Sequence, residues 1–173
     1  MKSAKKILAL ILAGVMALAL LTGCGKAASL NRTIAEGLAE YTKLTLAQAG
    51  NDKNISVSYQ VPELGRNIAP LFDENWITKD NSGKDALTEA AKKTLANILS
   101  PYMSDSSVVF LATDITDVKN PVLEVLNLNY SDIAFRSTIS APSQLTSITS
   151  MKIEVTHKTV NGRTYALAVM IGK

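Results

Sequence analysis

The pair Asn161-Gly162 is the feature that most constrains the fold, because it lies between two runs of strand-forming residues. Asn-Gly favours a two-residue type I′ turn, in which both residues have positive φ. The run after the turn, 164–171, is apolar on both faces, whereas 151–158 is polar on one. We therefore predict a C-terminal β-hairpin whose second strand lies inside a sheet and whose first strand lies nearer an edge.

This turn also fixes which side chains face each other across the hairpin, since opposed residues in an antiparallel pair share a face of the sheet. On one face the predicted pairs are Val155 with Ala168 and Ile153 with Met170. On the other face they are Lys158 with Tyr165, Thr156 with Leu167 and Glu154 with Val169.

Upstream patterns predict a first helix and two more strands. Periodic apolar residues predict a helix from about Leu30 to Ala49, with a capping box at 33–36 and a stop at Gly50-Asn51. Strict alternation predicts a half-buried strand over 55–61. The continuous apolar run 108–112 predicts a central strand.

A second helix is expected after the polar turn 80–85, with Ser82 and Asp85 as caps and Pro101 at its end. Segment 122–130 can be read as a helix opened by Asn120-Pro121 or as an alternating strand, and we favour the strand. Residues 137–150 are loop or one short helix, and short helical turns are expected around Trp76. The predicted fold class is α+β: one domain with helices packed on a small, mostly antiparallel sheet.

The N-terminal segment has the three parts of a secretory signal peptide. Residues 1–6 are basic, residues 7–21 carry no charge, and small residues follow. A membrane-spanning helix needs about 20 apolar residues, so a permanent span is the weaker interpretation.

The exit sequence Leu21-Thr22-Gly23-Cys24 resembles the lipobox of bacterial lipoproteins. This resemblance implies cleavage between Gly23 and Cys24 and a diacylglyceryl group on the Cys24 thiol. It divides the chain into a signal peptide (1–23), a lipidated cysteine with a short tether (24–29) and one extracytoplasmic domain (30–173). The expected location is the outer face of the cell membrane, with the lipid on Cys24 as the membrane contact.

Removing the signal also removes the net positive charge. Three of the 18 basic residues lie in 1–23, which leaves 15 basic and 15 acidic residues in the remainder. A neutral domain gives no basis for binding nucleic acid or for a polybasic membrane patch. Cys24 is the only cysteine, so a disulfide within the chain is impossible and a cysteine-based metal site has no second ligand.

No sequence pattern indicates catalysis. The chain lacks a phosphate-binding loop and a G-x-S-x-G elbow, and its only histidine, His157, is interpreted as a structural residue at a strand end. The acidic segments 80–85 and 114–117 are interpreted as turns rather than cation sites. We predict no cofactor and no metal. Residues considered as tentatively ligand-facing are Trp76, Tyr59, Tyr102 and His157.

A further resemblance concerns the CAP (SCP-like) secreted domains. Gly65-Arg66-Asn67-Ile68-Ala69, Trp76, Asn97-Ile98-Leu99 and the hairpin NGRTYALAVMIG occur in the order seen in that family. The resemblance implies an α/β/α sandwich and a binding module. The sequence departs from the family pattern at Arg66, where the family has Glu, and at Thr94-Leu95, where it has His-Arg, so its cation-binding residues have no counterparts.

Taken together, these observations favour a non-catalytic lipoprotein domain that binds a protein, an envelope polymer or a small ligand. Two alternatives remain open at this stage. One is an envelope hydrolase whose catalytic residues meet only in the fold, and the other is a structural subunit of a larger envelope assembly. A cleft with His157 or paired acids would favour the hydrolase, whereas an apolar groove would favour binding.

Overall fold

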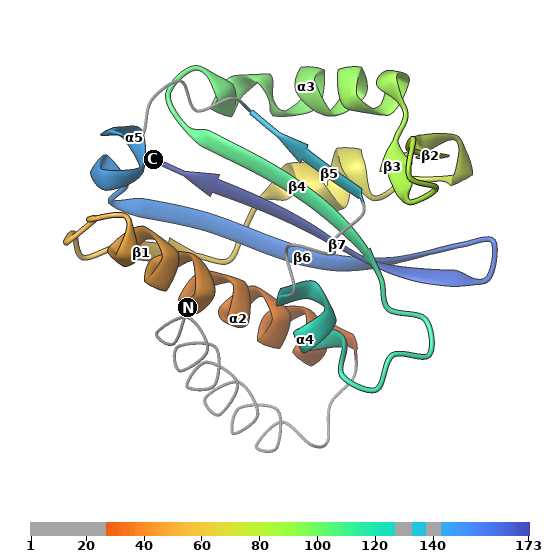
Figure 1. Ribbon diagram of the computed structural model, residues 1–173, viewed down its shortest axis with the longest axis horizontal. Helices are drawn as coiled ribbons and strands as arrows, with labels where there is room; N and C mark the ends of the chain where they lie inside the picture. Colours follow the sequence, from red (N-terminus) through yellow and green to blue (C-terminus); the bar gives the residue numbers. More distant parts are fainter. Residues whose placement is uncertain (1–26, 127–132, 138–142) are drawn as a thin grey trace.

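The computed structural model describes residues 27–126, 133–137 and 143–173 (Figure 1). The predicted signal peptide and Cys24 lie outside the described residues. Among the described helices, none has both the length and the apolar character needed to cross a membrane. The architecture is α+β, with helices on both faces of a five-stranded, mostly antiparallel sheet, which confirms the predicted fold class.

Five strands form the main sheet in the order β1-β6-β7-β4-β5, and β2 with β3 forms a separate two-stranded sheet. Strand β1 runs parallel to β6, and the other pairs are antiparallel. The elements are α2 (Ala27–Gln48), β1 (Ser56–Ser58), η1 (Leu64–Ile68), η2 (Glu74–Trp76), β2 (Ile77–Lys79), β3 (Asp85–Leu87), α3 (Glu89–Met103), β4 (Ser107–Asp114), α4 (Pro121–Leu126), β5 (Ile133–Arg136), α5 (Ser143–Ser147), β6 (Ser150–Val160) and β7 (Arg163–Gly172).

The C-terminal hairpin forms as predicted. Asn161 and Gly162 both have positive φ, 49° and 77°, as a type I′ turn requires. All five predicted side-chain pairs occur in the register between β6 and β7. Strand β7 lies inside the sheet between β6 and β4, while β6 is second from the edge and has β1 beside it only at 150–152.

Alternation along β7 creates two hydrophobic cores, because successive side chains point to opposite faces of the sheet. Leu167 and Val169 belong to the core under α3 and η1, whereas Ala166 and Ala168 belong to the core under α2 and α4. Figure 1 shows α2 and α4 on one side of the sheet and α3 on the other. Among the described residues, the buried side chains of both cores lie between Ile34 and Ile171.

The first helix begins at Ala27, three residues earlier than predicted, and ends at Gln48. The predicted capping box is therefore wrong, because Thr33 is a buried residue inside the helix. The predicted stop is confirmed: Gly50 has a φ of +94°, and the Asn51 N–H donates to the Leu46 carbonyl at 2.9 Å.

Helix α3 begins at a different residue from the one predicted. Its N-cap is Thr88, whose Oγ1 accepts from the Ala91 N–H at 3.2 Å, so Ser82 and Asp85 do not cap it. The Asp80 carboxylate instead accepts from the Ser82 and Lys84 N–H groups and closes the β2–β3 turn. Pro101 lies within the last turn of α3 rather than after it, and the Ser100 hydroxyl donates to the Asn97 carbonyl that proline cannot serve.

Two strand predictions need correction. Strand β1 covers only three residues of the predicted 55–61. Residues 121–126 form helix α4, with Asn120 Oδ1 accepting from the Leu123 N–H at 3.2 Å, so the preferred strand at 122–130 is wrong as far as Leu126. Residues 127–130 lie outside the described residues, as do residues 138–142 of the predicted loop or helix that includes α5.

Candidate functional site: an apolar groove between α2 and the sheet

A groove lies on the α2 face of the sheet, where the helix layer covers β6 but leaves part of β4 and β5 uncovered. One row of residues lies side by side across four strands: Ile153, Met170, Val109 and Arg136. The last three of them line the groove. Exposure rises along this row, from the buried Ile153 through the half-buried Met170 and Val109 to the exposed Arg136. The groove is therefore the part of this face that α2 does not close.

The walls come from α2 and from α5 with the residues that follow it. The volume is about 260 Å³, just below the range of about 300–1,000 Å³ typical of ligand pockets. Most of the lining is aliphatic side chain, and five lining residues carry hydroxyl groups. The lining residues are Tyr41, Thr42, Thr45, Leu46, Ser107, Val109, Leu111, Arg136, Ser137, Leu145, Ile148, Met151, Met170, Ile171 and Gly172.

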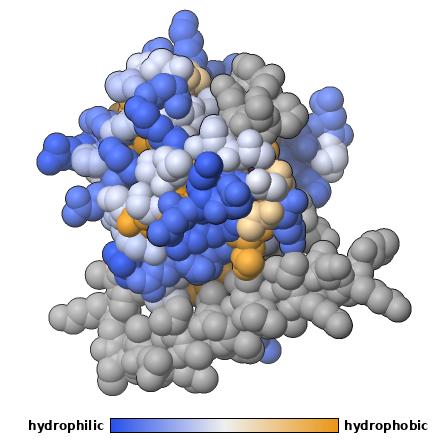
Figure 2. Space-filling view, turned by 90° about the vertical axis from the view of Figure 1, so that its left-hand side faces the viewer, coloured by the Kyte–Doolittle hydropathy of each residue, from blue (hydrophilic) through white to orange (hydrophobic). Residues whose placement is uncertain are grey.

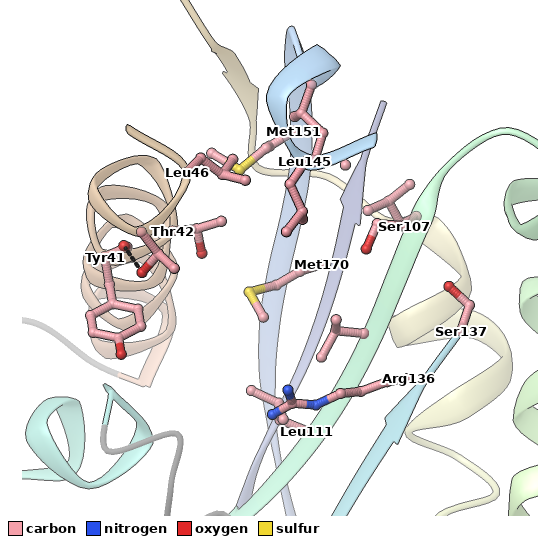
Figure 3. Close-up of a pocket in the computed structure, with 15 residues that line it drawn as sticks. Tyr41, Thr42, Leu46, Ser107, Leu111, Arg136, Ser137, Leu145, Met151 and Met170 are labelled. Carbon is pink, nitrogen blue, oxygen red and sulfur yellow. Dashed lines mark hydrogen bonds between the residues drawn. The ribbon is translucent and has the colours of Figure 1, made fainter. Parts of the chain in front are cut away.

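Among the described residues that line the groove, Arg136 alone is charged. Figure 3 shows its side chain extending from β5 over Leu111 toward α2. The Arg136 side chain has no ion-pair or hydrogen-bond partner among the described residues. An unpaired guanidinium beside an apolar surface can accept a carboxylate or phosphate in bidentate geometry.

The neighbouring Ser137 holds this end of β5 against β4. Its backbone N–H donates to the Val108 carbonyl at 2.9 Å, and its Oγ accepts from the Val108 N–H at 2.8 Å. The position of Arg136 is therefore set by a paired strand and not by a free loop.

The α5 end of the groove is fixed by one buried amide side chain. Asn51 is 4% exposed, and its Nδ2 donates to the carbonyls of Leu145 and Ile148 at 2.8 and 2.9 Å. Ile148 also packs closely on Gly172, where an added Cβ would lie 3.1 Å from the Ile148 Cδ1 atom. The end of α2 and the α5 segment therefore form one connected wall.

Figure 2 shows the side of the molecule that carries α5 and the C-terminus in Figure 1. This surface is mostly hydrophilic, and hydrophobic side chains reach it only in small patches. Among the described residues, the one large apolar side chain that is exposed is Leu71, at 50%. The groove is thus a local apolar feature of an otherwise polar surface.

A second, smaller cavity of about 90 Å³ is lined mostly by polar residues, which come from β3, β4, β7 and α4 and include Glu124. The Arg163 guanidinium lies between Asp114, at 2.6 Å, and Asp85, at 3.1 Å, and Lys79 pairs with Asp85 at 2.6 Å. Burial alone would raise the pKa of Asp85 and Asp114, but their hydrogen bonds and charge interactions outweigh it and lower both values. These acids are already neutralised, so the cluster joins strands and does not present a free acid pair.

The aromatic residues considered as ligand-facing do not come together. Trp76 is buried in the α3-side core, where its ring meets Phe72 edge-on at a centroid distance of 5.8 Å. Tyr102 lies on that same side and donates its hydroxyl to Glu63 at 2.9 Å. Tyr59 packs against the α2-side core, with the Arg32 guanidinium 3.6 Å above its ring. None of these residues lines the groove.

His157 lies on β6, opposite Ala166 and near the hairpin turn. Neither ring nitrogen has a hydrogen-bond partner among the described residues, and burial lowers the pKa of the imidazole. It does not line either cavity. Within the described residues, no three His, Asp or Glu side chains are grouped in a way that could hold a metal ion.

No protein-family model, no curated protein and no solved structure matches this chain. The resemblances to bacterial lipoproteins and to CAP domains therefore stay predictions. Sequence reasoning did not identify the groove, since its lining comes from α2, α5, β4, β5, β6 and β7. The one available signal was Arg136, a charge at the end of the apolar segment 133–135.

Proposed function

We propose that this chain is a lipid-anchored bacterial envelope protein whose domain binds a small, largely apolar ligand in the groove between α2 and the sheet. The observation that carries the proposal is the groove itself: about 260 Å³, mainly aliphatic, on an otherwise hydrophilic surface. Apolar concave surfaces with a few placed polar groups are the usual form of small-molecule sites.

The alternative of an envelope hydrolase receives less support from the same geometry. A hydrolase needs a base or a pair of acids in the cleft, within reach of the reacting bond. The described lining of the groove includes neither His157 nor a carboxylate, and the acids Asp85 and Asp114 are paired with Arg163 elsewhere. Binding is therefore the function that the described residues favour.

Groove binding can be tested with the neutral fluorescent probe N-phenyl-1-naphthylamine and the chain from residue 25 onward, which contains every residue of the two described cores. We expect probe fluorescence to rise on binding and the rise to be lost in Val109→Phe, because the larger ring fills the floor between Met170 and Arg136. Thr159→Phe, an exposed position near the hairpin turn, is the matched control and should bind normally. Equal binding by wild type and Val109→Phe would contradict the site, and no binding by wild type would contradict the proposed ligand class.

The anchor is tested separately by feeding cells an alkyne-labelled palmitate. We expect the wild-type chain to incorporate the label and Cys24→Ser to incorporate none, since the thiol is the predicted acceptor. Thr22→Ser keeps a small residue at the lipobox and serves as the control. Equal labelling of the wild type and Cys24→Ser would rule out lipidation at Cys24.

A further inference from the structure

We infer that the ligand of the groove is a single-chain aliphatic carboxylate, with its alkyl tail between α2 and the sheet and its carboxylate on Arg136. This inference rests on the proposed function and adds the chemical class of the ligand. It is carried by the position of one unpaired cation at one side of an aliphatic groove.

Among the described lining residues, the single charged side chain lies toward one end of the groove. Toward α5, the groove is bounded by Leu46, Leu145 and Met151, and Figure 3 shows these side chains grouped at one end of the view. Arg136 lies toward the other end, with its guanidinium over Leu111. A ligand that satisfies both regions has an apolar tail and an anionic head.

The unpaired guanidinium of Arg136 favours an anionic group on the ligand. Arg136 is exposed, and among the described residues it has no ion-pair partner and no acidic neighbour in the lining. A neutral or cationic ligand would leave the guanidinium unmatched, whereas a carboxylate forms two parallel hydrogen bonds with it. The planar fork of arginine suits this geometry better than a lysine ammonium does.

The location of the groove favours a ligand that comes from the aqueous phase. Tyr41, Thr45 and Leu46 lie in the C-terminal half of α2, whereas the predicted anchor precedes its N-terminal residue, Ala27. Tyr41 lies fourteen positions after Ala27, which corresponds to roughly 21 Å along the helix axis. The inferred ligand is therefore a soluble amphiphile and not a lipid held in the bilayer.

The test compares ligands that share a ten-carbon chain and differ in the head group: decanoate, decanol and decyltrimethylammonium. Binding to the chain from residue 25 onward is measured by calorimetry, and the methyl resonance of Met170 reports contact in the groove. We expect decanoate to bind most tightly. Arg136→Gln should weaken decanoate about fivefold and leave decanol unchanged, while Arg136→Lys should retain part of the preference.

The outcomes separate this inference from the proposed function. If decanol binds as tightly as decanoate and Arg136→Gln changes neither, the carboxylate class is wrong and groove binding stands. If none of the three ligands binds, or Val109→Phe still binds decanoate normally, both proposals are overturned. If phosphatidylglycerol vesicles bind in an Arg136-dependent manner and decanoate does not, the ligand is a bilayer lipid and the soluble class is rejected.

Discussion

The two faces of the sheet are built on the same strands but are closed to different degrees. On the α3 face, Val108 and Phe110 of β4 are fully buried, and Phe110 lies 6.4 Å from the Phe72 ring. On the α2 face, Val109 is only half-buried, although it lies between those two residues in the same strand. The difference comes from what covers each face, and not from the composition of the strand.

Bulky side chains fill the α3 face. The rings of Phe72, Trp76, Phe110 and Tyr165 meet at centroid distances between 5.4 and 6.5 Å, which leaves little room between η1 and the sheet. On the α2 face, β7 presents small residues at 166, 168 and 172, and α2 packs over β6. An open groove can therefore exist next to a closed core when one helix covers only part of a sheet.

The largest effect is expected when the aromatic cluster is broken. Phe72→Ala should lower the free energy of unfolding by about 3–5 kcal/mol, because it leaves a cavity in a fully buried core. Met170→Ala, which removes a half-buried side chain from the groove, should cost about 1 kcal/mol. Urea unfolding of both variants measures the difference, and equal losses would contradict the contrast between the two faces.

Two matched substitutions in β4 test the difference between the two faces directly. Val108→Ala and Val109→Ala remove the same two methyl groups from adjacent positions of β4, on opposite faces of the sheet. We expect a loss of about 2 kcal/mol for Val108→Ala and less than about 1 kcal/mol for Val109→Ala, because only Val108 is fully buried. The same urea titration tests this, and a larger loss at Val109 would show that the groove is packed more tightly than its exposure indicates.

The smallest effect concerns two arginines, one on each face. Arg163→Gln removes the partner of Asp85 and Asp114, and the loss at neutral pH should be below about 1 kcal/mol since Arg163 is partly exposed. Arg136→Gln removes an unpaired side chain and should leave stability unchanged at any pH.

The effect of Arg163→Gln on stability should depend on pH, and the pKa shifts of Asp85 and Asp114 give the direction of that dependence. The pKa values of Asp85 and Asp114 are lowered in the fold, so their ionised forms stabilise it above the ordinary carboxyl pKa of 3.8. That stability is lost as the pH falls below 3.8 through the lowered values. The difference between the wild type and Arg163→Gln in thermal unfolding should therefore shrink below pH 4, and a difference that grows there would contradict the ion-pair assignment.

Local signals predicted the parts of the fold that neighbouring residues decide. Asn161-Gly162 specified the hairpin turn, and the turn specified the register of ten residues on each side. The continuous apolar run in β4 correctly indicated an interior strand. These features depend on contacts between residues that are close in sequence or on burial of both faces of one strand.

The remaining elements depend on distant partners. Strand β1 pairs only where β6 lies beside it, from Ser56 opposite Ser150 to Ser58 opposite Lys152, so alternation over 55–61 overestimates its length. Alternation near 122–130 favoured a strand, but Val122, Val125 and Leu126 are buried on one face of a helix against α2. The groove combines six elements, and Arg136 is distinguished from other arginines only by its position in the fold.

The interior strand β7 also affects when the protein can fold. It pairs with both β6 and β4 and contributes side chains to both cores, yet it follows every other described element along the chain. During synthesis, neither core can be completed until β7 has left the ribosome. Such a delay is compatible with the proposed export across a membrane, because the chain can stay unfolded until β7 is made.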